Sequence, residues 1–271
     1  EPLQFQLELL GRDRRGAEHA ETARLRERGD DVATVAEPED RDVDAEHVGD
    51  AGMLALAAGS DGAPVPPPAL IADIGGGTYP AVINILLALR QRDLTGQGCY
   101  LDVAMTDAMF TFAGHAFASG HATSRFPGSG GTRLTGGSPR YQLYPTRDGK
   151  LVACAALEQK FWMTFAAAIG LTPEFIDDRR DPAAAIAAVA KIVVSRTADE
   201  WRPVFAKADS CVTIMASLEE ALRDPHFVDR GLFAHKLSGP TGQTMPALPV
   251  PIVPQFRDGA GSVKPVPILG G

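Results

Sequence analysis

The densest apolar stretch of the chain lies between residues 81 and 90, where only Asn84 and Arg90 are polar. Its apolar positions are Val82, Ile83, Ile85, Leu86, Leu87 and Leu89. This spacing predicts a helix that is buried over most of its circumference. After it, a short strand from Cys99 to Asp102 and a second apolar helix from Ala104 to Ala118 are predicted.

The next part of the chain combines a strand pattern with helices. Residues 141–156 predict two antiparallel strands joined by a turn at Asp148 and Gly149. Helices are predicted over Lys160 to Ile169 and within residues 181–207, and a strand is predicted over Cys211 to Ile214. We therefore expect an α+β unit here.

The two ends of the chain are poorer in apolar pattern. Half of residues 11–50 are Asp, Glu, Arg or Lys, which predicts a charge-laced helix over Ala20 to Arg28 with turns and a mobile connector around it. From residue 240 onward, frequent prolines predict an extended tail. These shifts divide the chain into residues 1–50, 51–140, 141–237 and 238–271.

Composition and charge narrow the function classes. The chain has 271 residues, 45% of them hydrophobic, so it can bury a full core. Its net charge of -8 argues against a nucleic-acid partner, because such partners select a basic face. We find neither a stretch long and apolar enough to span a bilayer nor a signal-peptide pattern, so we expect a cytoplasmic protein with no membrane partner.

The three cysteines point to neither disulfides nor a metal site. Cys99, Cys154 and Cys211 lie in apolar, strand-like surroundings and show no Cys-x-x-Cys spacing. Buried, reduced thiols are the prediction for all three.

One acid stands directly before the apolar helix. Asp73 is followed by Gly75, Gly76 and Gly77, and glycines leave the backbone open to a bulky ligand. At a helix start, unpaired N–H groups and the helix dipole favour an ionised carboxylate in a fixed orientation. An isolated Asp at this place is more often a helix N-cap, so the neighbouring motifs decide its interpretation.

Those motifs resemble one enzyme superfamily. The Asp-x-Gly-Gly-Gly run at Asp73, a helix rich in Leu and Ala, the Thr-Gly-x-Gly turn at Thr95 and the Asp-x-Ala-Met-x-Asp-Ala segment at Asp102 follow in this order. The order resembles the family III CoA-transferases and the related alpha-methylacyl-CoA racemases, from about Met53 to about Phe256. The resemblance implies an α/β fold with a partial large domain and a smaller α+β domain, an interlocked homodimer, and Asp73 as the catalytic aspartate.

Two further elements match this superfamily. Leu134-Thr-Gly-Gly-Ser-Pro resembles its Leu-x-Gly-Gly-x-Pro element, which implies that Gly136 and Gly137 let the backbone close over a thioester. Glu158 stands where the family has a glutamate that reaches toward the active site. An acid at a helix start also has a structural explanation in the helix dipole. Nearby, Arg133 and Arg140 are available for a phosphate or a carboxylate.

The resemblance implies transfer of CoA between carboxylic acids. A desolvated Asp73 carboxylate attacks the acyl-CoA carbonyl, and the glycine N–H groups stabilise the oxyanion. CoA thiolate then attacks the resulting anhydride to give an aspartyl-CoA thioester, from which the acceptor acid takes CoA. An acyl-CoA and a carboxylic acid are therefore the expected partners, with no permanently bound cofactor and no metal.

Two alternatives stay open. In the racemase branch Asp73 removes a proton alpha to the thioester, but the histidine of the Gly-His-Asp triplet is replaced here by Gly49, and His47 reads as a solvated loop residue. The nucleotide-binding half with which the family opens is not found in the chain. A truncated, non-catalytic family member is therefore the second alternative.

Overall fold

The computed structural model describes residues 6–8, 21–27, 30–37, 44–59, 62–248, 251–257 and 261–266. Within these residues the chain forms helices and three separate three-stranded sheets. The sheets contain strands β1 to β3, strands β4 to β6, and strands β7 to β9. The chain is therefore a mixed helix-and-sheet protein, as the sequence predicts.

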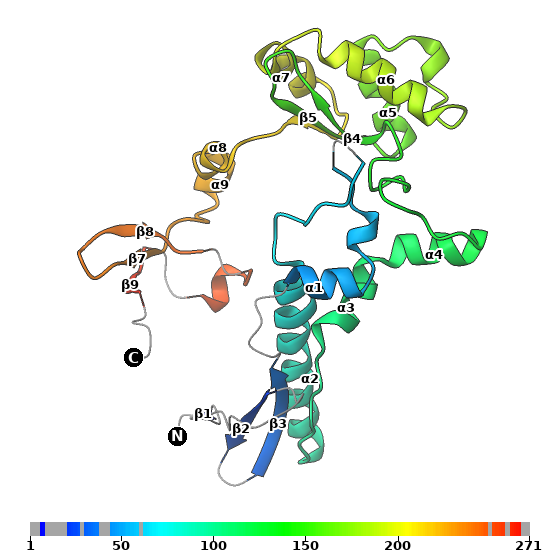
Figure 1. Cartoon of the computed structure of the whole chain (residues 1–271). Coiled ribbons are helices and arrows are strands. Elements are labelled where there is room, and N and C mark those ends of the chain that lie inside the picture. The colour runs from blue at the N-terminus through cyan, green and yellow to red at the C-terminus, as the bar shows by residue number, and fades with distance from the viewer. Residues whose placement is uncertain are drawn as a thin grey trace.

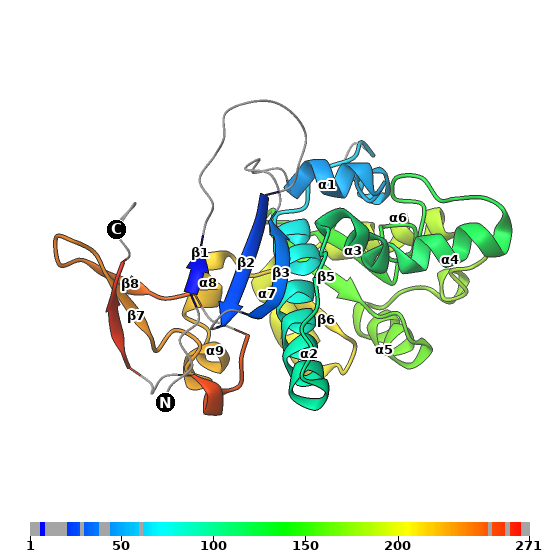
Figure 2. The same ribbon diagram turned by 90° about the horizontal axis from the view of Figure 1, so that it is seen from below.

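The charged N-terminal segment forms a sheet. Strands β1 (Gln6–Glu8), β2 (Glu21–Glu27) and β3 (Asp30–Glu37) pair in antiparallel order, and β3 lies beside helix α2 (Figures 1 and 2). The predicted helix over Ala20 to Arg28 is therefore wrong. Its sequence alternates apolar and charged residues at Ala23, Arg24, Leu25 and Arg26, and pairing with β3 fits this period of two.

The apolar helix begins ten residues earlier than Ala81. After α1 (Asp44–Asp50) and the 3-10 turn η1 (Leu54–Leu56), the π-helix η2 (Ile71–Thr78) continues directly into α2 (Tyr79–Thr95). Gly96 ends α2 in the left-handed conformation, with φ of 73°. Asp73 thus lies inside a helix rather than in a loop before one.

Helix α2 is far more exposed than its pattern predicts. Ala88 is its one buried residue, while Ile83, Leu86, Leu87 and Leu94 are between 55% and 72% exposed. The expectation of burial over most of the circumference is wrong for this chain by itself. By length and composition alone, the helix Ile71–Thr95 is also long and apolar enough to cross a membrane. The prediction that no stretch of the chain is long and apolar enough to span a bilayer is therefore wrong.

The second apolar helix is broken in two. Met105–Phe112 forms α3 and Gly114–Thr123 forms α4, with the break at Ala113. Residues 99–102 carry a single bridge residue, Leu101, instead of the predicted strand. Met105 and Met109 are buried, whereas the phenylalanines expected on the same apolar side are exposed: Phe110, Phe112 and Phe117.

The predicted hairpin and helices after residue 140 are confirmed and form one unit, the small α+β unit. Strands β4 (Tyr141–Pro145) and β5 (Leu151–Ala155) pair around the turn at Gly149, and β6 (Val212–Ile214) joins β5. The sheet is accompanied by α5 (Gln159–Ile169), η3 (Pro173–Phe175), α6 (Pro182–Val193) and α7 (Ala198–Lys207).

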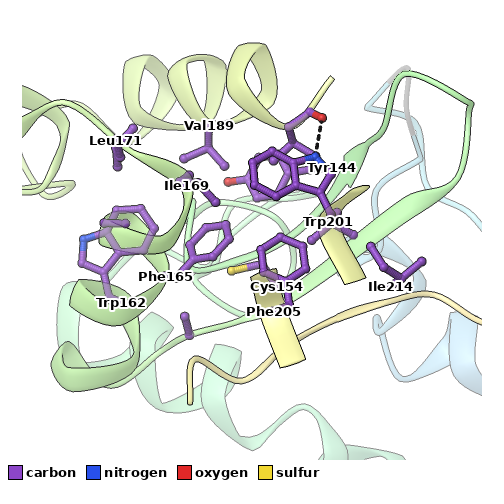
Figure 3. Packing of buried hydrophobic residues seen from close by; sticks show 14 of the residues in the cluster. Tyr144, Cys154, Trp162, Phe165, Ile169, Leu171, Val189, Trp201, Phe205 and Ile214 are labelled. Carbon is purple, nitrogen blue, oxygen red and sulfur yellow. Dashed lines mark hydrogen bonds between the residues drawn. The ribbon is translucent and has the colours of Figure 1, made fainter. Parts of the chain in front are cut away.

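This small α+β unit contains the main hydrophobic core (Figure 3). The Trp201 and Phe205 rings stack 5.3 Å apart, and the Trp201 indole donates a hydrogen bond of 2.9 Å to the Val193 carbonyl. Trp162, Phe165, Val152 and Val189 are fully buried around them. The core closes between the sheet and its own helices.

The C-terminal part of the chain is extended but pairs with itself. After α8 (Leu218–Leu222) and α9 (Pro225–Asp229), strand β7 (Lys236–Ser238) pairs with β8 (Thr244–Pro246) and β9 (Val263–Pro265). A 3-10 turn, η4 (Pro254–Phe256), lies between β8 and β9. The proline-rich tail thus carries a small sheet of its own.

Candidate active site

Asp73 is carried by a helix that packs closely on its neighbours. It lies in the first turn of η2 and is partly buried. Its neighbour Ala72 is fully buried, in a cluster with Val48 of α1 and with Met105 and Met109 of α3. Because this cluster fixes the inward face of η2, the Asp73 carboxylate stands on a rigid element at the electropositive start of a helix.

The three glycines after Asp73 have a packing function. A Cβ atom on Gly76 would lie 2.6 Å from the Met105 carbonyl oxygen, and one on Gly75 would lie 2.9 Å from the Phe112 ring. A Cβ on Gly77 would lie 2.9 Å from Met105 Cγ. The glycines therefore allow η2 to approach α3 closely.

The helical conformation bears on the expected oxyanion chemistry of the glycines. Residues 71–78 form a π-helix, and backbone N–H groups inside a helix are committed to its own carbonyl groups. Oxyanion stabilisation and substrate contact by these glycines both stay predictions.

The glycine loop, which is residues 127–140 before β4, needs both glycines of its family-matched element, Gly136 and Gly137, for its own fold. Gly136 has φ of 103°, and its carbonyl accepts a hydrogen bond of 2.7 Å from Gln142 Nε2. The Gly137 N–H donates to the Thr132 carbonyl at 2.9 Å, and a Cβ on Gly137 would lie 2.8 Å from that oxygen. The loop is thus tightly folded on itself.

The glycine loop also packs against the connector, which is the segment of residues 56–70 that leads to η2 and Asp73. Ser129 Oγ donates to the Ala57 carbonyl at 2.6 Å, and the Gly130 N–H donates to the Leu56 carbonyl at 3.2 Å. A cavity of 660 Å³ lies between the connector, the loop and the β4–β5 hairpin, and Gly136 lines it. The tertiary structure therefore brings together three segments that are distant in sequence.

Glu158 lies at the start of α5 in the small α+β unit. It is the exposed N-cap residue, and its side chain makes no capping hydrogen bond. By contrast, Glu200 and Glu220 each complete a capping box, and the backbone N–H groups of Thr197 and Ser217 lower the pKa of their carboxyl groups. A capping hydrogen bond therefore does not explain why an acid stands at position 158.

His47 is placed differently from its prediction. It belongs to helix α1 and is partly buried, and its Nδ1 lies 2.7 Å from Thr106 Oγ1 of α3. The interpretation as a solvated loop histidine is therefore wrong. Gly49, the position matched to the racemase histidine, is exposed on the same helix.

Arg140 was expected to be available for an anion, but it is buried in an ion pair. Its Nη2 lies 2.6 Å from Asp178 Oδ1, and Nε donates to both carboxylate oxygens. No local sequence pattern indicates this pair, since the two residues are 38 positions apart. Arg133, in contrast, is exposed and donates to the Leu157 carbonyl at 3.3 Å.

The cysteines only partly follow the prediction. Cys154 is buried in β5, and burial raises the pKa of its thiol to about 11. Cys99 and Cys211 are exposed free thiols, which corrects the expectation of burial. Over the described part of the chain, no group of three or more His, Cys, Asp or Glu side chains could hold a metal ion.

The chain that carries these residues can be compared with known proteins. The sequence profile described as CoA-transferase family III matches residues 37–271, which is most of the chain. The chain belongs to CoA-transferase family III.

Similar family members include enzymes of two reaction types. The alpha-methylacyl-CoA racemase of Mus musculus is 31% identical over 191 residues, covering 67% of this chain and 49% of that protein. The acetyl-CoA:oxalate CoA-transferase of Acetobacter aceti is 28% identical over 201 residues, covering 70% of this chain and 50% of that protein. The family III chain thus spans about half the length of the curated relatives it matches.

The fold agrees with this membership. A solved CAIB/BAIF family protein from Brucella suis superimposes with a TM-score of 0.58 at 25% identity, covering 81% of this chain and 58% of that chain. The structure is therefore a partial family III fold of mixed helix and sheet.

Proposed function

We propose that this family III chain is an acyl-CoA-dependent enzyme that transfers CoA between carboxylic acids through a covalent intermediate on Asp73. The observation that carries the proposal is the position of Asp73. It stands in the first turn of η2, and close packing of η2 on α1 and α3 fixes that turn. A carboxylate held in this way keeps one orientation toward an incoming thioester.

The proposed chemistry balances without a permanent cofactor. The Asp73 carboxylate forms a bond to the thioester carbonyl carbon, the C–S bond breaks, and CoA leaves as the thiolate. The thiolate then attacks the Asp73 carbonyl of the anhydride, which releases the donor carboxylate and leaves CoA bound to Asp73. Reversal of these steps with the acceptor carboxylate yields the new acyl-CoA.

Mass spectrometry after mixing the protein with an acyl-CoA and hydroxylamine tests this proposal. We expect a hydroxamate on Asp73, because hydroxylamine traps the anhydride or thioester formed there. The Asp73→Asn variant should show neither adduct nor turnover. Full turnover by this variant would show that the site assignment is wrong.

Racemisation is the second candidate, and two observations favour it. The Mus musculus relative is a racemase at 31% identity, and His47 lies on α1, which packs against η2. The transferase is preferred because Gly49 replaces the matched histidine, whereas nucleophilic attack needs only the carboxylate. Deuterium exchange at the alpha carbon without an adduct on Asp73 would favour racemisation.

A non-catalytic role is the third candidate, and its support is that the chain spans about half the length of these relatives. If the thioester pocket requires the remaining half of the relatives' length, this chain by itself has no complete site. Calorimetric titration with CoA separates the two cases. Binding tighter than roughly a millimolar, about 4 kcal/mol, supports a catalytic chain, and no detectable heat supports the non-catalytic one.

We also propose that the chain assembles as a homodimer. The support is the exposed apolar side of α2, which includes Leu86 at 61% and Leu87 at 59% exposed. Contiguous apolar surface of this kind is commonly covered by another chain. Sedimentation should give a dimer at micromolar concentration, and a stable monomer would contradict the proposal.

A further inference from the structure

Arg140 occupies an unusual place for an arginine. It ends the glycine loop, is 6% exposed, and directs its guanidinium group into the small α+β unit. Asp178, at 7% exposure, accepts hydrogen bonds from both Nε and Nη2, at distances of 2.6 to 3.1 Å. The charge of Arg140 is therefore neutralised by a carboxylate in a largely buried position.

The remaining hydrogen bonds of Arg140 reach both chain neighbours of Glu158. Nη1 donates to the Leu157 carbonyl at 3.3 Å, and Nη2 donates to Gln159 Oε1 at 2.9 Å. One turn further into α5, the Trp162 ring lies 5.3 Å from the guanidinium carbon. One planar group thus holds the residue before Glu158, the residue after it and the helix that follows.

The backbone that carries Arg140 is fixed as well. The Tyr144 hydroxyl donates to the Pro139 carbonyl at 2.8 Å, and the Arg140 N–H donates to Ser138 Oγ at 3.2 Å. Arg140 therefore connects a fixed end of the glycine loop to the start of α5.

Stability alone gives little reason for this buried pair. Desolvation of two charges offsets most of their attraction, and apolar residues of similar size often replace such a pair without loss of stability. Apolar residues cannot, however, hold a carbonyl and an amide in fixed positions. The hydrogen bonds to Leu157 and Gln159 are thus the property that requires an arginine with a buried partner.

We propose that Arg140, held by Asp178, is a positioning residue that sets the location of Glu158 relative to the glycine loop. The inference rests on the proposed function and on the expectation, implied by the family resemblance, that Glu158 contributes to turnover. Arg140 itself acts through Glu158.

A double-mutant cycle tests the proposal. Arg140→Gln should lower kcat on the order of 10- to 100-fold with KM within about twofold, because Glu158 is displaced rather than removed. In the Glu158→Gln background the same change should have no further effect on kcat. Arg140→Lys should recover only part of the loss, since an ammonium group cannot reach three acceptors at once. Additive losses in the cycle would overturn the proposal.

The chain offers a matched control. Arg147 also donates to a backbone carbonyl, that of Ser195, at 3.2 Å, and to a carboxylate at a helix start, that of Glu200, at 3.0 Å. Arg147→Gln should leave kcat unchanged. Hydrogen exchange of the amides in residues 157–162 should accelerate in Arg140→Gln and not in Arg147→Gln, and equal exchange in the two variants would contradict the proposal.

A further variant separates positioning from folding. Arg140→Met with Asp178→Leu should keep the fold but show the low kcat of Arg140→Gln, and wild-type kcat in this variant would overturn the proposal. Failure of the proposed function has a different signature, because Asp73→Asn then keeps its activity. The exchange rates and the coupling between Arg140 and Glu158 still decide the positioning role in that case.

Discussion

The small α+β unit and the helices around Asp73 differ in how completely they bury their apolar surface. In the small unit, Trp162, Phe165, Trp201 and Phe205 are at most 6% exposed, and the unit's own sheet and helices cover them. Among the described residues around Asp73, the buried cluster consists of Val48, Ala72, Met105 and Met109. Leu86, Leu87 and Leu94 of α2 remain exposed.

Because of this difference, the two candidate site residues, Glu158 and Asp73, are supported by parts of the chain that are packed to different extents. Glu158 stands on a unit that closes its own core, whereas Asp73 stands on a helix whose outer side is uncovered in one copy of this chain. Burial of apolar side chains is the main driving force of folding, so the small unit should be the more stable of the two. The geometry around Asp73 should depend more on what covers α2.

The largest expected effect is the loss of a core tryptophan. Trp201→Ala should cost about 3–5 kcal/mol of unfolding free energy, because it creates a cavity and removes the partner of the Val193 carbonyl. Urea unfolding followed by far-UV circular dichroism measures it. Trp201→Phe keeps most of the volume and should cost less. A loss below about 1 kcal/mol for Trp201→Ala would contradict the assignment of the main core.

A smaller effect is expected where η2 meets α3. Gly76→Ala should cost about 1–3 kcal/mol, because the added Cβ meets the Met105 carbonyl and the backbone must shift. The shift should also reduce adduct formation on Asp73. Gly114→Ala is the control, since its Cβ would meet nothing within 4 Å, and its stability should change by less than about 0.5 kcal/mol. Equal stability of the two variants would show that η2 and α3 are not in close contact.

Charges on the exposed side of α2 should hardly change the stability of a single chain. Leu86→Lys with Leu87→Lys should alter the unfolding free energy of the monomer by less than about 0.5 kcal/mol, because both side chains already face solvent. The same variant should abolish the proposed dimer in sedimentation. A wild-type dimer in this variant would show that another surface mediates association.

The smallest expected effect concerns acid stability near the small α+β unit. The Ser217 N–H and Lys150 lower the pKa of Glu220 from 4.5 to about 2. Since the folded chain releases this proton more readily, the stabilisation is present above pH 4.5 and is lost as the pH falls toward 2. Glu220→Gln should flatten the stability profile in that window only. An unchanged slope would show that the capping contact is not populated.

Local patterns accounted for much of the small unit. Strand-forming residues from Tyr141 to Ala156 and the Asp148-Gly149 turn predicted the hairpin, because strand propensity and turn chemistry are properties of neighbouring residues. The same reasoning misplaced Ala20 to Arg28, where charge content suggested a helix although the residues alternate with a period of two. Pairing with β3 decided in favour of a strand.

The sequence by itself determined that an acid stands at the start of an apolar helix, that a glycine loop precedes a hairpin, and that their order is that of family III. Only the tertiary structure decided that Gly76 serves the contact with α3, that His47 reaches Thr106, and that Arg140 pairs with Asp178 next to Glu158. The reason is physical, because helix and strand patterns are set by residues a few positions apart, whereas these contacts join residues 29 to 59 positions apart.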